Sequence, residues 1–149
     1  MYIVRHGEKT PMVGSLNDVG KARAQNLINE FNGERFSEPK ALYAHHYGNL
    51  VDKERCEETI KPISTHLNLW VNNSYGYLHP PGFGNTIAGL DILLNLSSKN
   101  VILVVWEHFN IQFLTHDLGV GSELKNRAIP DWPDEDFDTI YELHYNKPS

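Results

Sequence analysis

The sequence predicts an α/β fold, a three-layer α/β/α sandwich built around a mostly parallel sheet. Short apolar segments alternate along the chain with longer segments whose apolar residues recur at helical spacing. The strongest segment, residues 101–106 (VILVVW), is an unbroken apolar run, which is typical of a strand buried on both faces of a parallel sheet. The 149 residues suffice for a sizeable core, and we expect one domain over residues 1–149.

Five strands are expected, at residues 2–4, 41–44, 69–71, 101–106 and 139–145. The first four are short apolar runs bounded by polar residues or glycine, as buried strands are. The last one alternates apolar and polar residues, which suits an edge strand and is compatible with antiparallel pairing.

Four helices are expected, at residues 17–31, 53–67, 86–96 and 110–118. Asn17 or Asp18 can cap the first helix, and Gly33 follows its end. Pro62 lies within the second segment, where it either bends the helix or marks a break. The long segment between residues 72 and 84, rich in Gly, Pro and Asn, suggests a functional wall or lid.

Composition narrows the class of partner. The net charge of −6 argues against a general affinity for nucleic acid or for anionic membranes, so an anionic ligand needs a local positive pocket. No apolar run approaches the ~20 residues of a membrane span. Strand residues begin at Tyr2, so we expect no signal peptide, and the lone Cys56 suits a reducing compartment. The sequence therefore predicts a cytoplasmic protein.

Basic or imidazole side chains follow three of the predicted strands: Arg5 and His6, His45 and His46, and His108, which comes after Glu107. In open α/β sheets, ligands bind beyond the carboxyl ends of the strands. Arginine offers a planar fork of donors that suits phosphate, and histidine can act as a nucleophile near neutral pH. The convergence predicts an anion site at this edge of the sheet.

Several motifs occur in a fixed order along the chain: Arg5-His6-Gly7-Glu8, Leu16-Asn17 with Gly20 and Arg23-Ala24, Arg55 with Thr59, Trp106-Glu107-His108, and residues 132–138 (WPDEDFD). In these motifs the chain resembles the histidine phosphatase superfamily, the phosphoglycerate mutase-like proteins. The resemblance covers nearly the whole chain, and it is greatest for a compact branch whose second histidine lies in a Trp-Glu-His triplet.

The resemblance implies a phosphatase in which His6 attacks phosphorus and water then cleaves the phosphohistidine. Arg5, Arg55 and His108 would surround the transferred group and stabilise its charge in the transition state. We expect a small phosphorylated substrate, a pocket that accepts phosphate or sulfate, and neither a metal nor a cofactor. His6 must be neutral to attack, and a hydrogen bond from its other ring nitrogen to a backbone carbonyl would fix the tautomer.

The general acid departs from the family pattern. Many members carry a glutamate after the second helix, yet residues 62–98 contain no Glu and only one Asp, Asp91. Glu107 is the leading substitute, and Asp134 and Glu8 are others. Alternatively, a good leaving group such as an aryl or acyl phosphate needs little protonation. Phe109 stands where the family often has a small residue, which predicts a narrower pocket.

The remaining histidines carry less information. No carboxylate or cysteine joins His45 and His46 at a recognised ligand spacing, so we expect them to line the substrate pocket and not to bind a metal. His79 lies in the 72–84 segment, and the sequence assigns it no role.

Two alternatives to a phosphatase remain: a catalytically weak or inactive binder of phosphorylated ligands and, less favoured, a phosphomutase. The sequence does not fix the oligomeric state.

Overall fold

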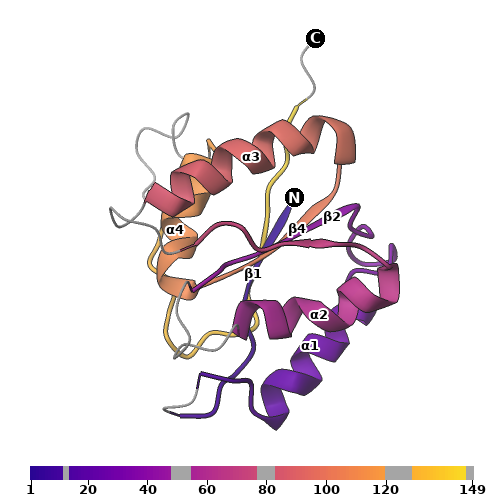
Figure 1. Ribbon diagram of the computed structural model, residues 1–149, viewed down its shortest axis with the longest axis vertical. Coiled ribbons are helices and arrows are strands. Elements are labelled where there is room, and N and C mark those ends of the chain that lie inside the picture. Colours follow the sequence, from indigo (N-terminus) through magenta and orange to yellow (C-terminus); the bar gives the residue numbers. More distant parts are fainter. Residues whose placement is uncertain (12–13, 48–54, 77–82, 120–128, 147–149) are drawn as a thin grey trace.

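The structure is a computed structural model that describes residues 1–11, 14–47, 55–76, 83–119 and 129–146 (Figure 1). Its elements, in chain order, are β1 (Tyr2–Arg5), α1 (Asp18–Glu30), β2 (Ala41–Ala44), α2 (Arg55–Leu67), β3 (Val71–Asn72), α3 (Phe83–Lys99), β4 (Ile102–Trp106), α4 (His108–Asp117) and β5 (Ile140–Glu142). His79 and the expected start of the second helix at Lys53 lie outside the described residues.

The five strands form one sheet in the order β3-β2-β4-β1-β5. All neighbouring pairs are parallel except β1 and β5, so the last strand is an antiparallel edge. β4 lies at the centre, where Val104 is in register with both Ile3 of β1 and Tyr43 of β2. The mostly parallel sheet and its antiparallel edge confirm the predicted fold class.

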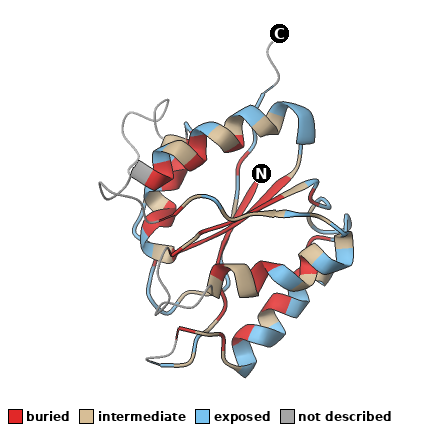
Figure 2. Cartoon of the chain, in the orientation of Figure 1, coloured by how far each residue is buried: buried red, intermediate tan, exposed pale blue. Residues whose placement is uncertain are grey.

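The helices cover both faces of the sheet, α1 and α2 on one face and α3 and α4 on the other (Figure 1). Alternate side chains of β4 enter the two resulting cores. Leu103 and Val105 pack with α1 and α2, while Ile102 and Val104 pack with α3 and α4. All four are fully buried, which explains why this strand reads as a continuous apolar run (Figure 2).

The boundaries of several elements differ from the prediction. Pro62 lies inside α2 without breaking it. α3 and α4 begin at Phe83 and His108, before the expected starts at residues 86 and 110. For α4 the reason is visible: the Glu107 side chain accepts from the N–H groups of Phe109 and Asn110 and thereby caps the helix. Asn17 caps α1 as predicted, accepting from Gly20 N–H at 2.9 Å.

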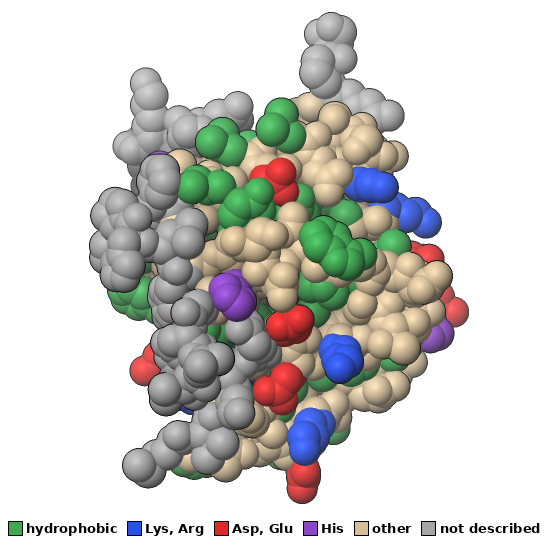
Figure 3. Space-filling model, in the orientation of Figure 1, with side chains coloured by type: hydrophobic (Ala, Val, Ile, Leu, Met, Phe, Trp, Pro, Cys, Tyr) green, Lys and Arg blue, Asp and Glu red, His purple; other side chains and the backbone are tan. Residues whose placement is uncertain are grey.

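No helix in the described part of the chain is long and apolar enough to cross a membrane. On the face shown in Figure 3, the described Lys and Arg side chains lie beside acidic ones instead of gathering in one patch.

Candidate active site

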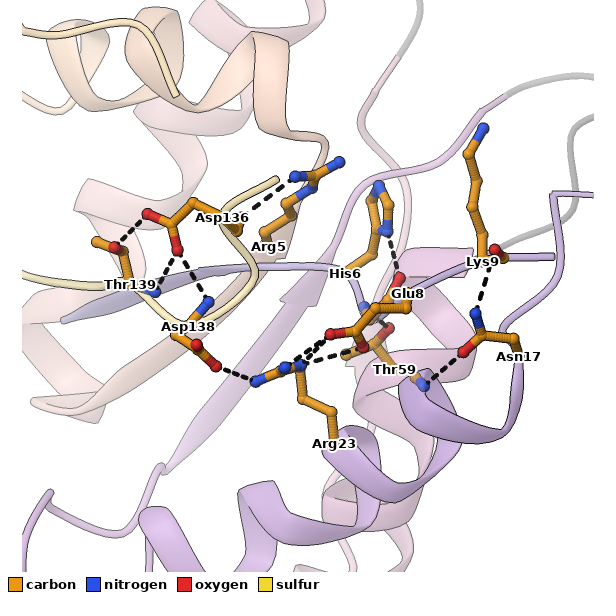
Figure 4. Close-up of polar contacts among 12 residues, drawn as sticks. Arg5, His6, Glu8, Lys9, Asn17, Arg23, Thr59, Asp136, Asp138 and Thr139 are labelled. Atoms are coloured by element: carbon orange, nitrogen blue, oxygen red, sulfur yellow. Dashed lines mark hydrogen bonds and ion pairs between the residues drawn. The ribbon is translucent and has the colours of Figure 1, made fainter. Parts of the chain in front are cut away.

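The turn after β1 holds His6 in one tautomer. The ring is buried, and Nδ1 donates to the backbone oxygen of Gly7 at 2.7 Å, as the sequence predicted (Figure 4). That leaves the lone pair on Nε2. Burial, helped by the neighbouring Arg55 and Arg5 charges and opposed by the Gly7 hydrogen bond, lowers the pKa of His6 to about 3. The ring is therefore neutral at physiological pH, as a nucleophile requires.

Two glycines let the first turn of α1 rest on this turn. A Cβ atom on Gly20 would lie 2.1 Å from the backbone oxygen of Glu8, and one on Gly7 would lie 2.8 Å from the backbone oxygen of Gly20. The backbone N–H of Asn17 donates to the same Glu8 oxygen at 2.9 Å. Only glycine permits this approach, which is how α1 fixes the direction of the His6 side chain.

Thr59 ties the His6 turn to α2. Its hydroxyl accepts from Gly7 N–H at 2.9 Å (Figure 4). It donates to the backbone oxygen of Arg55 at 2.7 Å. The hydroxyl is buried, so both of its hydrogen bonds are needed. The spacing of Arg55 and Thr59 thus serves to link their helix to the residue after His6.

Arg55, the first residue of α2, reaches the nucleophilic atom. Its Nε–H donates to His6 Nε2 at 3.2 Å, and its guanidinium lies over the Tyr47 ring, 4.2 Å from the centroid. The aromatic face holds the cation in place. An anion that approaches His6 Nε2 meets this guanidinium directly.

Most of the contacts of the Arg5 guanidinium are with the 133–137 segment of the protein itself. Nη1 donates to three backbone oxygens, at 3.5 Å from Pro133, 2.6 Å from Asp134 and 3.2 Å from Asp136, and the guanidinium stacks over Phe137 at 3.9 Å. Its Nε is buried and has no hydrogen-bond partner among the described residues. Arg5 therefore positions the 133–137 segment against the site and keeps a donor unused.

His108, the first residue of α4, faces His6. The two ring centroids are 6.4 Å apart at an interplanar angle of 80°. His108 Nε2 lies 3.0 Å from Asp134 Oδ1. Nδ1 lies 2.8 Å from Glu107 Oε1, a charge contact whose angle falls outside that of a hydrogen bond. The structure thus brings His6, His108, Arg5 and Arg55 to one edge of the sheet.

Glu107 is placed unfavourably for a general acid. The carboxylate is buried and accepts from Phe109 N–H at 3.0 Å, from Asn110 N–H at 3.1 Å and from the Asn110 side chain at 2.7 Å. Its position is that of a helix cap beside His108.

The other two carboxylates considered as acids differ in their surroundings. Arg23 grips Glu8 with Nε at 2.8 Å and with Nη2 at 2.6 Å, and it also binds Asp138 (Figure 4). Burial raises the pKa of Glu8, but the Arg23 hydrogen bonds outweigh it, so the pKa is lowered overall. Asp134 is 91% exposed and touches His108 at the mouth of the site.

Of the two consecutive histidines after β2, His45 is buried and His46 is only partly buried. The His45 ring is only 1% exposed and packs edge-on to Tyr47 and Trp106, with centroids 4.6 and 4.9 Å away. Burial lowers its pKa to about 3. His46 is partly buried and its backbone N–H donates to Tyr75 at 2.8 Å. The expected contact of His45 and His46 with substrate stays a prediction.

Two residues near the site escaped the sequence analysis. Asn85 of α3 and Asn110 of α4 are both buried, and the Asn85 side chain donates to Asn110 Oδ1 at 2.8 Å. The only signal was the spacing of Glu107 and Asn110, which are the N-cap residue and the third residue of α4.

Among the described residues, no three His, Cys, Asp or Glu side chains gather in a way that could hold a metal ion.

Comparisons with known proteins support the fold. No family model and no curated protein matches the sequence. Among solved structures, the chain is similar to SixA from Agrobacterium tumefaciens, a protein assigned as a phosphohistidine phosphatase, with a TM-score of 0.52 and 14% sequence identity. The match covers 85% of this chain and 82% of SixA. The chain therefore has the phosphoglycerate mutase-like fold that its sequence predicts.

Proposed function

We propose that the protein is a phosphatase that hydrolyses a phosphate monoester through a phosphohistidine on His6. One observation carries the proposal: a neutral, buried His6 whose Nδ1 is bonded to Gly7 oxygen and whose Nε2 faces the guanidinium of Arg55. A nucleophile and a cation that meet at one atom suit attack on an anionic phosphoryl group.

The reaction follows from these positions. The Nε2 lone pair of His6 bonds to phosphorus as the leaving-group oxygen departs with the electron pair of its P–O bond. Arg55, His108 and the unused donor of Arg5 stabilise the charge on the phosphoryl oxygens. Water then attacks phosphorus, the N–P bond breaks, and its electron pair returns to Nε2. No step calls for a metal or a cofactor.

The likeness to SixA, a protein assigned as a phosphohistidine phosphatase, supports phosphatase chemistry on this fold. It also adds phosphoramidates to the substrate classes to be screened, beside small phosphate esters. The lone cysteine favours work under reducing conditions, as in the cytoplasm where we infer that the protein acts.

A second candidate function is a binder of phosphorylated ligands without turnover. Two contacts favour it: Arg55 occupies Nε2 of His6, and Asp134 occupies Nε2 of His108, so both imidazole atoms already have partners. A ligand that replaced these partners without reacting would leave the protein a sensor of phosphorylation.

Turnover of an aryl phosphate distinguishes the two functions. We expect the wild-type protein to hydrolyse it and His6→Ala to lose that activity, whereas His144→Ala, which changes an exposed histidine of the edge, should keep it. Phosphate binding without turnover in the wild-type protein would support the binder instead.

A further inference from the structure

A chain of buried hydrogen bonds links Trp106 to Glu107 through two asparagines. Trp106 Nε1 donates to Asn85 Oδ1 at 2.9 Å, Asn85 Nδ2 donates to Asn110 Oδ1 at 2.8 Å, and Asn110 Nδ2 donates to Glu107 Oε2 at 2.7 Å. The four residues are between 0% and 9% exposed. We call this chain the amide relay. It joins β4, α3 and α4 directly behind His108.

The direction of every bond in the amide relay is fixed. An indole N–H can only donate, so the oxygen of Asn85 must face Trp106. The NH₂ group of Asn85 must then face Asn110, and by the same reasoning the NH₂ group of Asn110 faces Glu107. The usual ambiguity in the orientation of side-chain amides is therefore absent here.

The amide relay ends on a carboxyl group whose described hydrogen-bond partners all donate to it. Besides Asn110 Nδ2, the Glu107 oxygens accept two backbone N–H bonds from the first turn of α4. A protonated carboxyl would need an acceptor for its own O–H, and each of these described hydrogen-bond partners is a donor. A buried carboxylate with three hydrogen bonds is stable as an anion.

This buried negative charge lies beside the second histidine. Glu107 Oε1 is 2.8 Å from His108 Nδ1, so the buried carboxyl group lies directly against this ring nitrogen. On the other side of the ring, Nε2 meets an oxygen of the exposed Asp134 at 3.0 Å. The ring thus has a carboxylate oxygen beside each of its nitrogens, with Nε2 on the side of the exposed Asp134.

We propose that His108 donates the proton to the leaving group, that Glu107 keeps it charged, and that Asn85 and Asn110 are positioning residues. The inference rests on the proposed phosphatase function. As His6 attacks, the P–O bond breaks, and its electron pair on the leaving oxygen takes the proton from His108 Nε2. In the second step the now neutral His108 takes a proton from the attacking water, so the enzyme returns to its first state.

This assignment accounts for the missing acid. The chain has no glutamate in residues 62–98, Glu8 is held by Arg23, and Glu107 accepts three hydrogen bonds as the cap of α4. An imidazolium between the buried carboxylate and the site can supply that proton. It also gives a role to the two amides buried beside the site. Removing an amide from water costs free energy, and here that cost is offset by hydrogen bonds that hold Glu107 in place.

A series of substrates with different leaving groups tests the proposal. Glu107→Gln and Asn110→Leu should lower the turnover of alkyl phosphates roughly 10- to 100-fold more than that of aryl phosphates, since an acid contributes most when the leaving group is poor. Gln112→Leu, which removes an α4 amide outside the relay, should leave the ratio unchanged. An unchanged ratio in both relay variants would overturn the proposal.

A spectroscopic measurement guards against a variant that merely unfolds. In the wild-type protein near neutral pH, ¹⁵N NMR should show both nitrogens of His108 protonated, and in Glu107→Gln one of them should lose its proton. Asn85→Leu, which leaves the carboxylate and the helix cap in place, is the second variant. A neutral His108 ring in the wild-type protein would contradict the inference.

The two proposals fail in different ways. If the wild-type protein hydrolyses no phosphate ester, the phosphatase function and the proton donor fall together. If it forms a phosphoenzyme and hydrolyses aryl phosphates, but the alkyl-to-aryl ratio does not respond to Glu107 or Asn110, only the proton donor is wrong.

Discussion

Arg55 places its Nε–H 3.2 Å from Nε2 of His6, on the atom that we propose as the nucleophile. The contact joins the first residue of α2 to the turn after β1, 49 residues earlier in the chain. The arginine that would bind the phosphoryl group in the proposed reaction therefore donates directly to the proposed nucleophile.

Arg55→Ala should weaken the binding of phosphate or vanadate. A hydrogen bond to a charged group contributes about 1.5–3 kcal/mol, so the Kd should rise roughly 10- to 100-fold. Isothermal titration calorimetry measures the change, and Arg35→Ala, which removes an exposed arginine paired with Glu30, is the matched control. Equal affinity in wild type and Arg55→Ala would place this residue outside the pocket.

Thr59→Val should loosen the His6 turn. Valine keeps the shape but leaves Gly7 N–H without its acceptor, which should lower the free energy of unfolding by about 1–3 kcal/mol and reduce turnover. Urea unfolding and aryl phosphate kinetics check both. Thr59→Ser should restore the two properties, and Thr65→Val, on the exposed side of α2, should change neither. A fully active Thr59→Val would show that this tie is dispensable.

Asp134→Asn should strengthen phosphate binding. The carboxylate holds His108 Nε2 and must leave when an anion enters, so its removal should lower the Kd about 2- to 5-fold, as expected for an exposed ion pair. Asp131→Asn in the same segment is the control. A fall in turnover with unchanged phosphate affinity would instead identify Asp134 as the acid and would also overturn the assignment of His108.

Stability should fall as the solution becomes acidic. Burial lowers the pKa of both His6 and His45 to about 3, whereas an unfolded histidine titrates near about 6.5. Between about pH 3 and about pH 6.5, these two histidines are protonated in the unfolded chain but neutral in the folded one. The contribution is therefore complete above about pH 6.5 and is lost as the pH falls towards about 3, by up to about 1.4 kcal/mol per pH unit for each histidine.

Urea unfolding between about pH 7 and pH 4 measures this slope. His45→Gln should reduce it by the share of one histidine, while His144→Gln, on a side chain that is 81% exposed, should leave it as in wild type. A slope that His45→Gln does not alter would contradict the buried, neutral state of this ring.

The fold was predictable because its signals are local. The unbroken run of apolar residues in β4 predicted a strand covered on both faces. The alternation of apolar and polar residues in the last strand predicted an edge strand. Asn17 caps α1 as its sequence context indicated. The continuity of α2 through Pro62 was not predictable, because packing of the buried Ile60 and Ile63 decides it and the local preference of proline does not.

The site was predictable in its members but less so in their contacts. Strand ends and motif order pointed to Arg5, His6, Arg55 and His108, which do come together. No sequence pattern shows that Nη1 of Arg5 binds the backbone of residues 133–136, since backbone acceptors carry no residue signature. Nor does any pattern show that Asn85 is buried, because its partners Trp106 and Asn110 lie more than 20 residues away.

Trapping the phosphoenzyme tests the central claim most directly. The wild-type protein, mixed with a ³²P-labelled aryl phosphate and quenched in alkali within one turnover, should carry label on His6 that survives alkali and is lost in acid, and His6→Asn should carry none. Hydrolysis of the ester with no label on His6, or at an undiminished rate in His6→Asn, would contradict nucleophilic attack by this histidine.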